Sequence, residues 1–91
     1  ERVRRVDAAE SFLRTEFELT EFRVRHEANE LARIEVPVDQ LPRLLDPATR
    51  QAITTHFREL GFAFVTIDLE GFRSGSLNSV VSIDDLQVLG D

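Results

Sequence analysis

Apolar and charged residues alternate in two short stretches in the first half of the chain. Residues 22–26 read FRVRH and residues 32–36 read ARIEV. A period of two is typical of β-strands that have one buried and one exposed face. We therefore predict two strands, joined as a hairpin because only a few residues separate them.

The length of the hairpin loop decides which side chains share a face. A loop of residues 28–30 places Val24 opposite Ile34 and keeps the apolar residues together. A two-residue loop would set Val24 against Arg33 and would mix apolar with charged positions. Asn29 tolerates the left-handed conformation that tight loops need. We therefore predict the three-residue loop.

Two other stretches have the spacing of helices. Residues 2–16 carry an apolar stripe that should face the core. Its members are Val3, Val6, Leu13 and Phe17. Phe12 lies off this stripe, so we expect it to touch a neighbouring subunit or another part of a longer chain. The second helix should begin after its N-cap Asp46 and end at Gly61. Its inward residues should be Ile53, Phe57 and Leu60.

A third strand is predicted for residues 62–69, which read FAFVTIDL. Phe62 and Phe64 should point to one side, and the other side is apolar as well. A strand that is apolar on both faces is normally central or covered twice. The order α-β-β-α-β predicts an α+β fold with a small mixed sheet and helices packed on one face.

Two further segments have weaker patterns. Pro37 should end the second strand, and Asp39 should cap a short turn that reaches Leu44. Residues 79–91 fit either a short helix or an edge strand.

Composition narrows the class of protein. The 91 residues include 17 acids against 11 arginines, for a formal charge of −6, and no cysteine. This length fits one domain. An acidic chain repels phosphate backbones, so we expect no nucleic-acid partner. No apolar run approaches the ~20 residues that span a bilayer, so we expect no membrane partner and a cytoplasmic location.

The predicted hairpin gathers arginines on the face opposite to its apolar residues. Arg23, Arg25 and Arg33 should lie within cross-strand reach, and Glu35 should lie opposite Arg23. Guanidinium groups at such spacing repel each other unless an anion or a carboxylate lies among them, and phosphate fits their planar fork. Two interpretations stay open: an anion-binding site, or a solvated face with an ordinary Arg23–Glu35 pair.

Other polar positions are less specific. Glu10 falls inside the stripe of the first helix, so it is either an acid at a cleft or the partner of a strand arginine. Residues 73–76, RSGS, could present backbone N–H groups to an anion or form a plain turn. His26 and His56 lack the spacing of metal ligands, and we predict no metal site.

Several of these segments resemble the C-terminal part of LarE-type proteins, sulfur transferases of the PP-loop ATP pyrophosphatase superfamily. The resemblance rests on FRVRH at residues 22–26, on LARIEVP at residues 31–37, and on ELGF at residues 59–62. It continues through VTIDLEGFRSGSLN at residues 65–78. It covers about residues 2–81.

The resemblance implies a function. LarE-type enzymes adenylate the carboxylate of a pyridinium-type nucleotide with ATP and Mg²⁺ and convert it to a thiocarboxylate, which builds a nickel-pincer cofactor. By position, Glu10 and Glu35 match acids of the sulfur-transfer pocket. Arg23 and Arg25 match arginines near the substrate phosphate. Arg33 and Arg73 fall in family motifs, and we include them among the candidate phosphate ligands.

We therefore expect residues 1–91 to be a single C-terminal domain, a fragment of a longer chain. It would contact a small-molecule nucleotide substrate and would form a homo-oligomer. The ATP loop and the sulfur-bearing cysteine would lie upstream, so the chain by itself should neither hold ATP nor donate sulfur. The alternative is a stand-alone, non-catalytic interaction or dimerisation module with an anion-binding arginine face.

Overall fold

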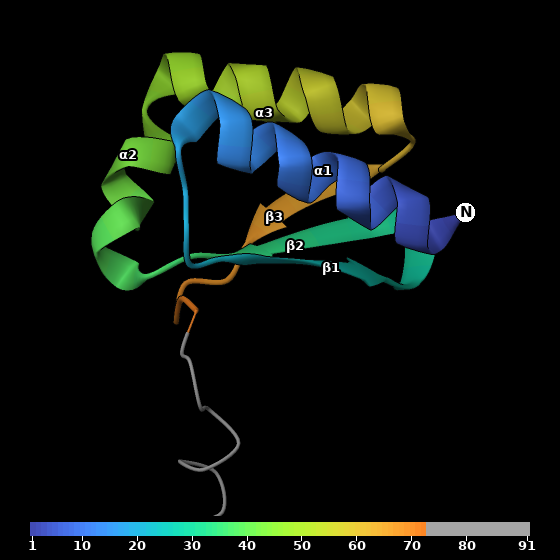
Figure 1. Cartoon of the computed structure of the whole chain (residues 1–91), viewed down its shortest axis with the longest axis horizontal. Helices are drawn as coiled ribbons and strands as arrows, with labels where there is room; N and C mark the ends of the chain where they lie inside the picture. The colour runs from blue at the N-terminus through green and yellow to red at the C-terminus, as the bar shows by residue number, and fades with distance from the viewer. Residues whose placement is uncertain (73–91) are drawn as a thin grey trace, which may run out of the picture.

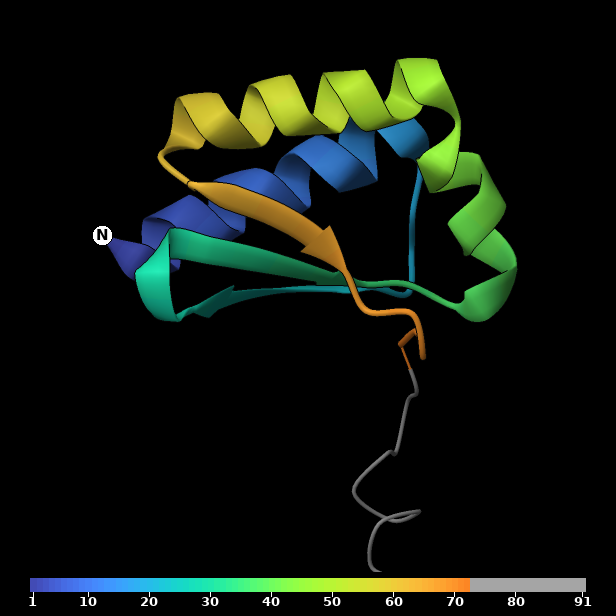
Figure 2. The same cartoon turned by 180° about the vertical axis from the view of Figure 1, so that it is seen from behind.

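The computed structural model describes residues 1–72 of the chain. They form, in order, α1 (Arg2–Phe17), β1 (Arg23–Glu27), η1 (Ala28–Glu30), β2 (Leu31–Glu35), η2 (Val38–Gln40), α2 (Leu41–Leu45), α3 (Pro47–Leu60) and β3 (Phe64–Ile67). Figures 1 and 2 show α1 and α3 on the same side of the three-stranded sheet. The predicted α+β fold, with helices packed on one face of a small mixed sheet, is confirmed.

The sheet has the order β1-β2-β3, with β1 antiparallel and β3 parallel to β2. Val24 lies opposite Ile34, as the three-residue loop requires. Asn29 has a φ of 64°, so it is left-handed as the sequence predicts, and Glu30 after it is left-handed as well, with a φ of 57°. The predicted hairpin register is therefore confirmed.

The core lies between the sheet and the two long helices. Its buried residues are Ala9, Leu13, Leu19, Val24, Ala32, Ile34, Val36, Leu44, Ile53, Phe57 and Phe62. Phe12, which was expected to touch a neighbouring subunit or another part of a longer chain, packs against a helix of the described residues. Its ring stacks on His56 of α3, with 3.9 Å between the ring centroids, and packs against the core. Val3, which the stripe placed inward, is 72% exposed because it lies at the outer end of α1.

The predicted ends of α3 are confirmed. The Asp46 side chain accepts a hydrogen bond from the Ala48 N–H at 3.2 Å, and Gly61 ends the helix at a φ of 111°. The predicted cap at Asp39 was wrong. The Gln40 N–H donates to the Pro37 carbonyl at 2.8 Å, so the turn has already begun before Asp39, which lies inside η2.

Two expectations for β3 were wrong. Phe62 is 2% exposed whereas Phe64 is 54% exposed, so these side chains do not share a face. The reason is that the Phe62 N–H donates to the Phe57 carbonyl at 3.1 Å, which keeps Phe62 in the closing turn of α3. In addition, β3 is an edge strand among the described residues and not a central one.

The helix side of β3 borders an apolar hollow of about 220 Å³. It lies where β3 meets α2 and α3. Its lining residues are Ile34, Leu44, Leu45, Arg50, Ile53, Thr54, Val65, Ile67 and Leu69. Leu69 is 78% exposed and Leu45 is 49% exposed, so the rim of this hollow presents large apolar side chains to solvent.

After β3 the chain turns across the end of β2. The Asp68 N–H donates to the Ile34 carbonyl at 2.9 Å, and the Phe72 N–H donates to the Val36 carbonyl at 2.7 Å. Gly71 lies between these bonds with a φ of 82°, and a Cβ there would be 2.8 Å from the Val36 oxygen. The expectations for residues 73–78 and for the tail, residues 79–91, lie outside the described residues.

A polar cluster fastens α1 to the hairpin loop. The Glu30 carboxylate accepts hydrogen bonds from the Arg5 guanidinium at 2.5 Å and from His26 Nε2 at 2.7 Å. A carboxylate that is ionised can only accept, so the Nε2 of His26 carries the proton. The hydrogen bond from His26, followed by that from Arg5, lowers the pKa of Glu30 below its ordinary value of 4.5. The Arg5 guanidinium also lies 5.6 Å from the centre of the Phe62 ring.

Gly71 provides a test of the tight turn after β3. We expect Gly71→Ala to lower the free energy of unfolding by about 1–3 kcal/mol, because alanine is strained at positive φ and its methyl group would press on the Val36 carbonyl. Chemical denaturation measures this change. The control is Ala63→Ser, an exposed change just before β3, which should cost less than about 0.5 kcal/mol. Equal effects of the two substitutions would show that the turn at Gly71 can accept a Cβ atom without strain.

Glu30 provides a test of the cluster through pH. Its pKa is lowered in the folded chain, so its contribution to stability is fully present above pH 4.5 and disappears as the pH falls through the lower, folded value. We expect Glu30→Gln to reduce stability at neutral pH and to weaken the loss of stability below pH 4.5. Urea denaturation at a series of pH values measures both effects. Glu59→Gln, an exposed change on α3, should retain the full acid-induced loss.

Candidate functional site

The face of the sheet opposite to α1 and α3 carries the arginines that the sequence predicted. Arg25 lies opposite Arg33, and Arg23 lies opposite Glu35. Because neighbouring residues of a strand point to opposite sides, these four side chains lie away from the helix side that buries Val24. The structure thus brings the predicted residues of the hairpin together on one surface, which we call the arginine face: Arg23, Arg25, Glu27, Arg33 and Glu35.

Two carboxylates hold two of the guanidinium groups on this face. Arg25 Nε donates to Glu35 Oε2 at 2.9 Å, and an Arg33 terminal nitrogen lies 3.5 Å from the same oxygen. That Arg33 nitrogen also lies 3.1 Å from Glu27 Oε2. The Glu35 side chain is 12% exposed, although no helix covers this face among residues 1–72. Glu35 therefore contacts both Arg25 and Arg33, and Glu27 contacts Arg33 alone.

Arg23 has no such partner. It is exposed, and its guanidinium forms no ion pair with any residue from 1 to 72. The Arg23–Glu35 pair of the solvated-face interpretation is thus not formed, since Glu35 turns to Arg25. Three arginines against two glutamates leave the arginine face with a charge of +1 on a protein whose net charge is −6. This excess positive charge lies at Arg23.

Sequence reasoning missed Glu27. The predicted strand ended one residue before it, whereas β1 extends to Glu27. The signal was present, because Glu27 has the same parity as Arg23 and Arg25 and therefore points to the same face.

Glu10 approaches β1 from the helix side. Its Oε2 accepts a hydrogen bond from the Val24 N–H at 3.0 Å, and the residue is half-buried. It therefore binds the backbone of the strand and not an arginine, which the sequence had offered as its partner. Nearby, an Arg2 guanidinium nitrogen donates to the His26 carbonyl at 2.6 Å. Glu10 and Glu35 lie on opposite sides of the sheet, so the structure does not bring these two predicted acids together.

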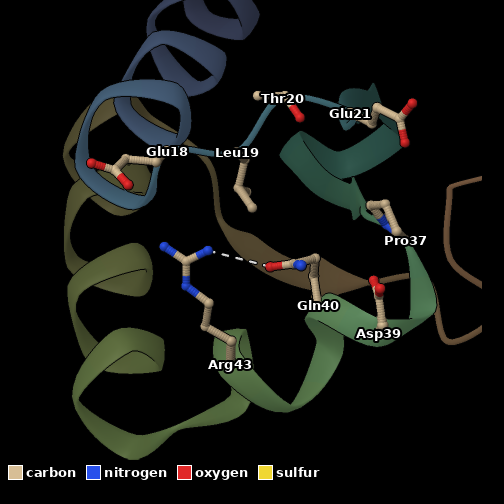
Figure 3. Close-up of a pocket in the computed structure, with 8 residues that line it drawn as sticks. All are labelled: Glu18, Leu19, Thr20, Glu21, Pro37, Asp39, Gln40 and Arg43. Carbon is tan, nitrogen blue, oxygen red and sulfur yellow. Dashed lines mark hydrogen bonds between the residues drawn. The ribbon is translucent and has the colours of Figure 1, made fainter.

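A polar cavity of about 230 Å³ lies at the other end of α1, and no sequence signal pointed to it. Figure 3 shows its lining residues: Glu18, Leu19, Thr20, Glu21, Pro37, Asp39, Gln40 and Arg43. The Arg43 guanidinium donates to the Gln40 side chain at 3.3 Å and to the Phe17 carbonyl. The Arg43 guanidinium, which is the positive group of this cavity, therefore already links α2 to the end of α1.

Arg73, the remaining candidate phosphate ligand, lies outside the described residues. Within residues 1–72, no group of three or more His, Cys, Asp or Glu residues could hold a metal ion. No helix in that part of the chain is both long enough and apolar enough to cross a membrane.

Comparison with known proteins finds relatives but no matching family model. An uncharacterized protein of Synechocystis sp. is 40% identical over 82 residues, which are 90% of this chain and 30% of that protein. The pyridinium-3,5-bisthiocarboxylic acid mononucleotide synthase of Lactiplantibacillus plantarum is 36% identical over 80 residues, 88% of this chain and 28% of the synthase. The chain therefore spans less than a third of the length of the curated relatives it matches. It is distantly related in sequence to a LarE-type synthase.

Proposed function

We propose that this chain is the C-terminal part of an ATP-dependent sulfur transferase of the PP-loop superfamily. The whole enzyme would convert the carboxylate of a pyridinium nucleotide to a thiocarboxylate in nickel-pincer cofactor biosynthesis, in the cytoplasm. The 36% identity to a synthase whose named product is a bisthiocarboxylic acid mononucleotide supports this proposal. ATP and Mg²⁺ would bind to the part of the enzyme outside this chain, which itself would supply contacts to the substrate phosphate and between subunits.

The arginine face is the observation that carries this proposal. A mononucleotide has a phosphate monoester, and phosphate accepts short, charge-assisted hydrogen bonds from guanidinium groups. Arg23 is exposed and unpaired among residues 1–72, and Arg25 lies on the same strand face, fixed by Glu35. We propose that Arg23 and Arg25 bind the substrate phosphate, assisted by Arg33 and by Arg73.

The proposed acids have different places. Glu35 lies among the guanidinium groups, where it can orient Arg25 and Arg33 toward the substrate. Glu10 lies at the outer edge of β1, held by the Val24 N–H. We propose that both act in the sulfur-transfer pocket, Glu35 from the arginine face and Glu10 from the strand edge.

We also propose that the protein is a homo-oligomer. Several large apolar side chains are at least half exposed: Val3 (72%), Val38 (59%), Phe64 (54%) and Leu69 (78%). Leu69 and Leu45 belong to the rim of the apolar hollow beside β3. A small domain gains stability when such surfaces are buried between copies, and a two-fold pairing is the commonest arrangement.

Light scattering tests the proposed oligomer. We expect a mass of at least twice the 10.4 kDa of one chain at high concentration. Replacing Phe64 and Leu69 by Asp should shift the mass toward the monomer while the far-UV circular dichroism stays unchanged, because both side chains are exposed. A strict monomer of the unaltered chain at high concentration would contradict the proposal.

Titration with inorganic phosphate tests the arginine face. We expect chemical-shift changes at Arg23 and Arg25 that weaken at high salt, since exposed charges are screened. Arg23→Ala should weaken binding by about tenfold or more, the value of one charge-assisted hydrogen bond, and replacing both arginines by Ala should abolish it.

The matched control replaces Arg4 and Arg58, two exposed helix arginines, by Ala. This variant loses the same two charges and should retain phosphate binding. If phosphate shifts the segment around Arg73 and leaves the hairpin unchanged, the site lies elsewhere and the assignment of Arg23 and Arg25 is wrong.

A further inference from the structure

Glu27 differs from the other carboxylate of the arginine face in how it is held. The Glu27 side chain is 42% exposed and contacts one guanidinium, that of Arg33, whose side chain is 40% exposed. Glu35 is 12% exposed and contacts both Arg25 and Arg33. An ion pair between two half-exposed side chains is weak and is screened by salt, whereas a shared, covered carboxylate is difficult to displace.

The guanidinium of Arg33 is incompletely hydrogen-bonded within residues 1–72. Its Nε is buried and has no hydrogen-bond partner among the described residues. Its terminal nitrogen is shared between Glu27 and Glu35, at 3.1 and 3.5 Å. The guanidinium of Arg33 is therefore neither saturated with hydrogen bonds nor fixed by a single strong contact.

We infer that Glu27 is a displaceable counter-ion that sets the anion affinity of the arginine face. This inference rests on the proposed function, in which the face binds a phosphate group. In the free protein Glu27 neutralises Arg33. When a phosphate binds, its oxygens take over Arg33, and the Glu27 carboxylate turns to solvent. Glu35 stays in place and keeps Arg25 and Arg33 oriented.

A competing role and a positioning role of Glu27 predict opposite effects of its removal on phosphate affinity. If Glu27 only positioned Arg33, its removal would weaken phosphate binding. If Glu27 competes with the anion, its removal strengthens binding, because one negative charge and one competing acceptor leave the site. Bringing the face from a charge of +1 to +2 should tighten phosphate binding by about threefold to tenfold at low salt.

Phosphate titration of the 91-residue chain, followed through the Nε–H signals of its arginines, tests this inference. We expect Glu27→Gln to bind inorganic phosphate about threefold to tenfold more tightly than the unaltered chain, with a larger shift at Arg33. Glu59→Gln is the matched control, since it removes the same charge from the exposed side of α3. Its affinity should stay within about twofold. Adding Arg33→Ala to Glu27→Gln should remove most of the gain.

The outcomes separate the inference from the function on which it rests. If the unaltered chain binds phosphate and Arg23→Ala weakens this binding, but Glu27→Gln binds no better than Glu59→Gln, the inference is overturned and the proposed site survives. If neither the unaltered chain nor Glu27→Gln binds phosphate, the proposed phosphate site fails and the inference fails with it. Circular dichroism should show all variants folded, because the Glu27 side chain is half exposed.

Discussion

The pairing of Val24 with Ile34 across the β1–β2 hairpin is the constraint on which both faces of the sheet depend. Side chains alternate along a strand, so this one pairing places the apolar residues under the helices and the charged ones on the other side. A slip of one residue would bury arginines and expose the core. The three-residue loop at Ala28–Glu30, with Asn29 in the left-handed conformation, fixes the register. The core and the arginine face are therefore two results of the same turn.

Helix α1 holds this hairpin through polar contacts as well as through the core. Arg5 reaches Glu30 in the loop, Arg2 reaches the His26 carbonyl, and Glu10 reaches the Val24 N–H. These contacts extend along β1 from the loop toward its start. They hold β1 from the helix side of the sheet, which leaves its other face to the arginines.

The parts of the fold that depend on local chemistry could be predicted from the sequence. The hairpin register followed from alternation, and both ends of α3 followed from Asp46 and Gly61. Phe12 could not be placed from its helix stripe, because its partner His56 is 44 positions away and only tertiary packing brings the rings together. Phe62 looked like part of a strand, since a hydrogen bond to the preceding helix leaves no trace in an apolar pattern.

The sequence predicted which residues share the arginine face, but it did not predict which of them form ion pairs. Alternation alone placed Arg23, Arg25, Arg33 and Glu35 on one face. It could not show that Glu35 turns to Arg25, because side chains as long as these reach diagonal neighbours as easily as opposite ones. The excess charge at Arg23 depends on that choice and on the additional carboxylate of Glu27.

The two edges of the sheet are unlike, and this limits how the sheet can grow. At β1 the outward Val24 N–H and His26 carbonyl are already occupied by Glu10 and Arg2, so a further strand would first have to break these bonds. At β3 the described residues offer an edge without a neighbouring strand, beside an apolar hollow. Two molecules that joined through β3 would each turn a blocked β1 edge outward. Such a sheet would end after a single joining event, so a β3 edge that is uncovered among residues 1–72 would not lead to open-ended polymerisation.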